Sequence, residues 1–253
     1  MITKKASSVF AFALIAMAAG AGSAEAQSSK AAWRYEEIVA LGTASSPAGT
    51  NDTGWVSILT TNIKTPNAKE LAMGVSLQCG LVTDTTVRSK GGDLDSAASR
   101  GRIRVRVKIT QPNGVEVYGQ PNNGADLTND ISFDNQGGGL TYCDRYQQLS
   151  AKFSGLNCTA DLVTGAVTCA DPEELRLLLQ TLSAHHFNFI HANAIPGIHK
   201  IEVQARAEAG ILLGGTELGD ASAEAFAGAG SLSVEVIRLV RGESGVTDLD
   251  NLN

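Results

Sequence analysis

The sequence predicts an all-β protein, an antiparallel β-sandwich with one short helix near residues 172–183. Three observations predict the sandwich. Several segments alternate apolar and polar residues with a period of two, turn-forming residues separate these segments, and 43% of the 253 residues are hydrophobic, which is enough for a core. Alternation of this kind is typical of antiparallel sheets that bury one face and expose the other to water.

The clearest expected strand is residues 103–109, in which isoleucine or valine occupies every odd position and arginine or lysine every even one. The same alternation predicts strands at 71–81, 201–207 and 232–239. Turn-forming residues lie between them, at 65–67, 111–114, 120–124, 137–139 and 196–197. No repeat and no long linker interrupts this order, so we expect one domain.

The expected helix begins at an N-cap, Asp171, with proline at the first helical position and two glutamates in the first turn. The leucines that follow are spaced for one helical face: Leu175, Leu178, Leu179 and Leu182. This helix is predicted to cap an end of the sandwich or to cover an edge strand.

Residues 196–205 carry a resemblance to a known architecture. A Pro-Gly turn leads into alternating residues, with His199 at the position where tyrosine is commoner. This segment resembles the penultimate strand of immunoglobulin-like sandwiches. The predicted sandwich is immunoglobulin-like or jelly-roll-like, and the resemblance, which is to the first kind, supports the architecture only and transfers no function.

The first 26 residues have the parts of a secretory signal peptide. Lys4 and Lys5 precede an apolar run at 9–19, and Ala24-Glu25-Ala26 forms a cleavage site. The apolar run is too short to span a bilayer. We therefore expect residues 1–26 to be cleaved and 27–253 to be a single secreted domain, in the periplasm or at the cell exterior, with no membrane insertion.

Export makes disulfides the expected state of the four cysteines, because zinc sites need more closely spaced pairs. Cys158 and Cys169 flank a hairpin with a four-residue loop at 162–165, and in that register they face each other. The remaining pair is then Cys79 with Cys143.

The sequence is compatible with two metal sites. In each case the favoured interpretation needs no cofactor: structural histidines for the first site and solvated turn residues for the second. His191 and His199 would face each other across a hairpin and could bind copper or zinc with a third ligand. A structural calcium ion could bind an acidic, glycine-flanked segment that contains Asp126, Asn129, Asp130, Asp134 and Asn135.

A basic strip occupies even positions before and within the strand at 103–109. Its members are Arg100, Arg102, Arg104, Arg106 and Lys108. Side chains at alternate positions share one face of a strand. The strip is interpreted either as an ordinary wet face or a charge-protected edge, or as a docking surface for an anionic polymer or a neighbouring subunit.

The net charge of −6 argues against a nucleic-acid partner. The sequence has no hydrolase motif such as G-x-S-x-G or H-E-x-x-H, so an enzyme is not the favoured interpretation. We expect an extracellular structural or binding protein that self-associates into a surface assembly. The alternative is a secreted hydrolase or a carbohydrate-binding accessory domain, against which the 5% aromatic content counts.

Overall fold

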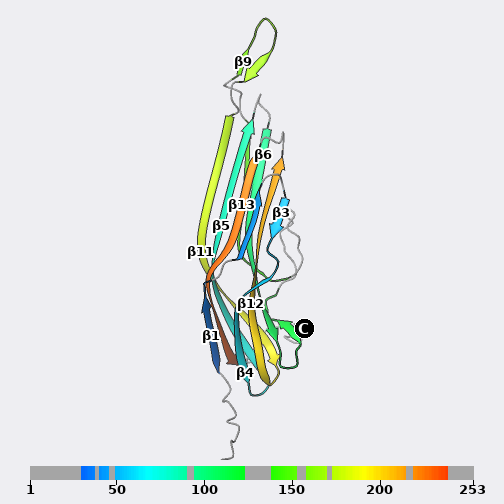
Figure 1. Cartoon of the computed structure of the whole chain (residues 1–253), viewed down its shortest axis with the longest axis vertical. Helices are drawn as coiled ribbons and strands as arrows, with labels where there is room; N and C mark the ends of the chain where they lie inside the picture. The colour runs from blue at the N-terminus through cyan, green and yellow to red at the C-terminus, as the bar shows by residue number, and fades with distance from the viewer. Residues whose placement is uncertain are drawn as a thin grey trace, which may run out of the picture.

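The computed structural model describes residues 30–37, 40–45, 49–89, 94–122, 138–152, 158–169, 173–214 and 219–238. These residues form strands and turns, with no helix among them, so the described part of the chain contains no helix able to cross a membrane. Two antiparallel sheets pack face to face in an elongated sandwich, which confirms the predicted fold class (Figure 1).

Sheet A has five strands in the order β1-β13-β5-β11, with β2 also paired to β13. Their bounds are β1 (Ala31–Glu36), β2 (Ala40–Ser45), β5 (Lys69–Ser89), β11 (Glu173–Ala194) and β13 (Asp220–Ile237). β11 pairs with β5 along nearly its whole length and forms one edge of the sheet.

Sheet B has six strands in the order β3-β12-β6-β7, with β4 also paired to β12 and β8 to β6. Their bounds are β3 (Gly49–Asp52), β4 (Val56–Thr65), β6 (Leu94–Thr110), β7 (Glu116–Tyr118), β8 (Leu140–Lys152) and β12 (Gly197–Gly214). A separate hairpin of β9 (Cys158–Ala160) and β10 (Val167–Cys169) stands at the top of the view in Figure 1.

The core changes character along the sandwich. Large apolar side chains, among them Leu71, Met73 and Ile109, form the main core cluster between the two sheets. Towards the other end of β5 the inward positions become small or polar, and Thr83 there donates a hydrogen bond to Gln147. The upper half is therefore held by fewer apolar contacts.

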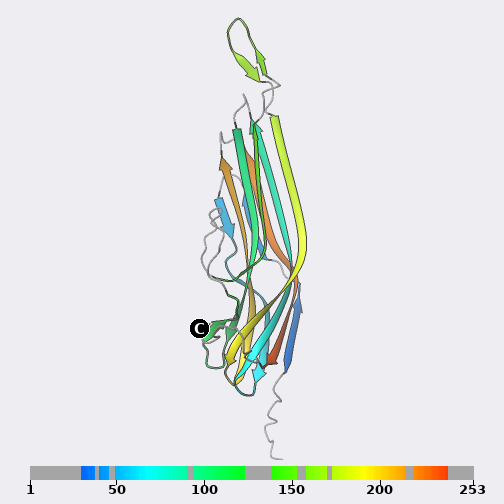
Figure 2. The ribbon, with the colours of Figure 1, turned by 180° about the vertical axis from the view of Figure 1, so that it is seen from behind.

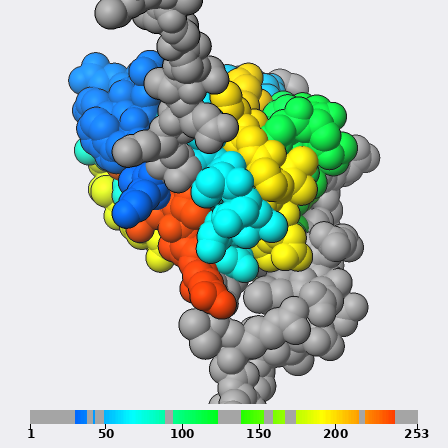
Figure 3. All heavy atoms as spheres, turned by 90° about the horizontal axis from the view of Figure 1, so that it is seen from below, coloured from blue at the N-terminus to red at the C-terminus, as the bar shows by residue number. Residues whose placement is uncertain are grey.

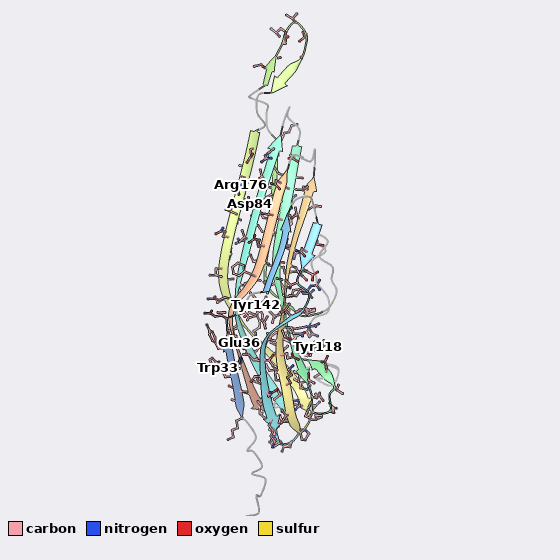
Figure 4. The ribbon with its side chains drawn as sticks, in the orientation of Figure 1. Trp33, Glu36, Asp84, Tyr118, Tyr142 and Arg176 are labelled. Carbon is pink, nitrogen blue, oxygen red and sulfur yellow. A yellow bond between two sulfur atoms is a disulfide. The ribbon has the colours of Figure 1, made fainter. Side chains whose placement is uncertain are left out.

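The long strands of sheet A bend near mid-height, as both ribbon views show (Figures 1 and 2). Tyr142 of β8 lies at this bend (Figure 4), where its hydroxyl accepts a hydrogen bond from Leu77 N at 2.9 Å and donates one to the His185 carbonyl. Burial raises the pKa of Tyr142 to about 12, so the hydroxyl remains a donor at neutral pH.

The lower end is closed by turns that lie side by side: the cyan turn after β4, the yellow turn before β12 and the green turn before β7 (Figure 3). Gly197 has a φ of +132°, and a Cβ there would lie 2.5 Å from Pro112 Cγ. The Pro-Gly turn predicted from the sequence therefore requires its glycine both for conformation and for packing.

The predicted helix at 172–183 is wrong, because the described residues from Glu173 onwards belong to strand β11. Leu175, Leu177 and Leu179 lie on the inner face of the sheet, opposite Val87, Thr85 and Thr83. A leucine run satisfies a helical spacing and a strand with two apolar faces equally well. Pairing along β5 decided between them, since tertiary context overrides weak local preference.

Candidate functional site

The basic strip lies on the outer face of sheet B, along β6. Its positions pair with even-numbered residues of β12, which confirms that they share a face. The expectation of a wet surface is wrong for most of it, since Arg100, Arg102 and Arg104 are only 3%, 0% and 2% exposed. Any anion that binds these residues must therefore reach them beneath the surface.

Carboxylates from the two neighbouring strands pair with the strip, one of them buried (Glu208) and one more exposed (Asp144). Glu208 of β12 lies opposite Arg102, and its Oε2 accepts a hydrogen bond from Arg102 Nε at 2.5 Å. Arg100 Nε donates to Asp144 Oδ1 of β8 at 2.9 Å. The strip is thus part of an ionic network across three strands, and burial of both partners makes the Arg102–Glu208 pairing obligatory.

Aromatic rings cover the lower part of the strip. The guanidinium carbon of Arg106 lies 4.2 Å from the ring centroid of Trp55 and 4.9 Å from that of Tyr118 (Tyr118 is labelled in Figure 4). These are cation–π distances. Burial is the main cause that lowers the pKa of Arg106 from its ordinary value.

Sequence reasoning missed Glu208 and Arg206 as members of this site. The signal was present: both lie on the even positions of β12, whose odd positions form the core. What the alternation of one strand cannot show is which other strand will lie beside it, and hence which charges will meet.

The two histidines proposed as metal ligands lie in different sheets, His191 in β11 and His199 in β12, with both on inward positions. His199 is fully buried, and its Nε2 lies 2.7 Å from the Ile195 carbonyl and 3.2 Å from Thr65 Oγ1. The described residues contain no group of three metal-ligating side chains. Metal binding by this pair stays a prediction.

His191 supplies a pH-dependent contribution to stability. Burial, and then the neighbouring His199, lowers the pKa of its ring from 6.5. The ring is therefore neutral in the folded protein under conditions in which the unfolded chain binds a proton. Stability from this group is present above pH 6.5 and is lost as the pH falls below that value.

We expect the free energy of unfolding to decrease between pH 7 and pH 5, and the slope to be smaller in His191→Gln. Urea unfolding at several pH values within that interval measures both. His186→Gln is the control, because His186 is exposed on the outer face of sheet A. Equal slopes in the wild type and His191→Gln would contradict the assignment.

The predicted disulfide between Cys79 and Cys143 is confirmed, and it links β5 of sheet A to β8 of sheet B. The predicted hairpin register is also confirmed: Cys158 is the Cα partner of Cys169, and Asp161 N donates to the Ala166 carbonyl. The side chains of Cys158 and Cys169 lie outside the described residues, so their disulfide stays a prediction.

The acidic segment proposed for calcium, 126–135, lies outside the described residues, as does the signal peptide at 1–26.

An aromatic pair is exposed on β1, where Trp33 is 68% and Tyr35 51% exposed and their ring centroids are 6.4 Å apart (Trp33 is labelled in Figure 4). Exposed rings of this kind are what the carbohydrate-binding alternative requires.

The edge formed by β11 carries a run of exposed apolar side chains. Five leucines are between 39% and 66% exposed: Leu175, Leu177, Leu178, Leu179 and Leu182. One side of β11 pairs with β5. On its other side, within the described ranges, Ile190 forms a bridge with Gln120, and no strand pairs with the part of β11 above Ile190 in Figure 1. The upper edge therefore presents apolar side chains along a strand that no second strand pairs within the described ranges, and β8 reaches its backbone at Leu177, whose carbonyl accepts a hydrogen bond from Gln147 Nε2 at 2.7 Å.

No protein-family model matches the chain, and a comparison with curated proteins gives no match. Two solved structures show slight similarity to this chain, and both are of infectious bursal disease virus. The Gt strain structure is 10% identical with a TM-score of 0.16, covering 89% of this chain and 48% of that one. The Gx strain structure is 10% identical with a TM-score of 0.17, covering 83% and 40%. The chain thus spans less than half of each, and scores this low carry no argument.

Proposed function

We propose that residues 27–253 form an exported structural protein that assembles with copies of itself through the upper edge of β11. The signal-peptide pattern and the Cys79–Cys143 disulfide support export. The observation that carries self-association is the leucine-rich edge strand, because a long apolar edge is a template for pairing with another chain.

Charges do not protect this edge. Arg176 pairs with Asp84, side by side in Figure 4, and Arg88 with Glu174, so the charges near the leucines are engaged within sheet A. Lower on the same strand, the Gln120 bridge occupies the edge at Ile190. A backbone bridge therefore protects the lower end of β11, whereas in the leucine run a single side chain, Gln147 of β8, caps the Leu177 carbonyl and the leucine side chains remain exposed.

A second copy is the occupant that fits best. Antiparallel pairing of two β11 strands about a twofold axis near Leu178 makes the two sheets continuous and replaces the hydrogen bond that Gln147 donates to the Leu177 carbonyl in the single chain. On the inner face it sets Leu177 opposite Leu179 of the second copy. Such an interface is self-complementary, as twofold contacts are, and burying a half-exposed leucine contributes on the order of 1 kcal/mol.

The double variant Leu178→Lys/Leu182→Lys should convert the assembled protein to monomer, while the free energy of unfolding of the monomer changes by no more than about 0.5–1 kcal/mol. The reason is that both side chains are exposed in the single chain, at 48% and 66%, and lysines prevent edge-to-edge pairing. Size-exclusion chromatography with light scattering, over a range of protein concentrations, measures the assembly.

The matched control is Leu94→Lys/Leu212→Lys, which changes two leucines of similar exposure, 61% and 50%, on sheet B. It should assemble like the wild type. A wild type that is monomeric at every concentration would overturn the proposal. Retention of that monomer by a polysaccharide would instead favour the carbohydrate-binding alternative, for which Trp33 and Tyr35 are the supporting observation.

A further inference from the structure

One buried cation in the basic strip lacks adequate partners. Arg104 is 2% exposed, and its Nε and Nη1 are both buried with no hydrogen-bond partner. Its ion-pair contact is with Glu208, where Nη1 lies 4.0 Å from Oε1, beyond hydrogen-bonding distance. Buried guanidinium groups in folded proteins are normally hydrogen-bonded.

Glu208 does not satisfy Arg104 in this structure: its Oε2 accepts a hydrogen bond from Arg102, and its Oε1 is buried without a hydrogen bond. Its Oε2 lies 2.5 Å from Arg102 Nε, and its Oε1 lies 3.0 Å from Arg206 Nε. Arg206 is also the cross-strand neighbour of Arg104. Arg104 therefore shares one carboxylate with two arginines that lie nearer to it.

The surroundings of Arg104 disfavour its charged form. Burial lowers the pKa of Arg104 from its ordinary value, and the positive charges of Arg102, Arg206 and Arg106 lower it further, against the opposing effect of Glu208. The side chain still carries its charge at neutral pH. Trp55 Nε1 is another buried donor without a hydrogen-bond partner, and it belongs to the ring that stacks on Arg106, the next residue of the strip.

We infer that Arg104 is the centre of a binding site for one small tetrahedral oxyanion, sulfate or phosphate, held as a structural ion on the outer face of sheet B. An oxyanion supplies the missing negative charge and offers several acceptor oxygens to guanidinium donors. The burial of Arg104 restricts the ligand to a small anion and excludes a polymer. This site is independent of assembly through β11, which lies in the other sheet.

The test is the thermal stability of the mature protein, refolded in chloride buffer, as sulfate up to about 20 mM replaces chloride at constant ionic strength. A ligand that binds only the folded state raises the melting temperature. For a domain of this size we expect a rise of about 3–5 °C once sulfate exceeds its dissociation constant tenfold. Phosphate at the same ionic strength should act in the same way.

Arg104→Met should abolish the rise, and Arg88→Met, which removes an exposed arginine of sheet A, should retain it. If Arg104→Met does not fold, Arg104→Lys replaces it: this variant keeps the charge but loses the guanidinium, and it should need more sulfate for the same rise. The absence of a rise in the wild type overturns the inference. So does a rise that persists in Arg104→Met, or a dose dependence unchanged in Arg104→Lys, since either would show general salt stabilisation.

Discussion

Replacing both Cys79 and Cys143 with alanine should lower the free energy of unfolding by about 4 kcal/mol, the value expected from the chain entropy of a loop of this length. The bond closes a separation of 64 residues and links the two sheets. Cys79 is also fully buried between them. The double substitution avoids leaving a reactive thiol in the core.

Urea unfolding of the two proteins measures this difference. The control is Cys158→Ala/Cys169→Ala, which changes the hairpin of β9 and β10. That hairpin forms a two-stranded sheet of its own, so the unfolding of the sandwich should be affected much less. A loss below about 1 kcal/mol for the Cys79 and Cys143 pair, or a larger loss for the hairpin pair, would contradict the chain-entropy argument.

The sequence predicted those features that depend on local pattern. Residues 71–81 and 103–109 alternate because one face of each strand packs in the core, and both lie within strands of the sandwich. The hairpin register was predictable because a short loop ending in glycine leaves one arrangement in which Cys158 and Cys169 face each other.

The predictions that were wrong concern features that depend on contacts between segments far apart in the sequence. Alternation placed Arg102 and Arg104 on one face of β6, but it could not show that Glu208 of β12 would lie beside them or that this face would be buried. The leucines of β11 likewise suit a helix until β5 supplies a partner strand. Neither the pairing of β6 with β12 nor that of β11 with β5 can be predicted from the local pattern of one segment.

The ionic network of sheet B leads to the second large effect. Glu208→Gln should lower the free energy of unfolding by about 3–5 kcal/mol, the cost of removing one partner from a buried ion pair. Glu208 is 1% exposed and Arg102 is 0% exposed. Glutamine retains the shape of the side chain, so the loss reports the charge rather than packing.

The position of Glu208 between several arginines makes its substitution more damaging than that of its closest partner. Arg102→Met leaves Glu208 with Arg206 at 3.0 Å, whereas Glu208→Gln leaves the positive charges of Arg102, Arg104 and Arg206 facing a neutral amide. Urea unfolding of both variants should therefore rank Glu208→Gln as the less stable. The control Glu174→Gln breaks the exposed pair with Arg88 and should cost no more than about 1 kcal/mol. If Glu208→Gln costs as little as that control, the buried network contributes no more than surface charges do.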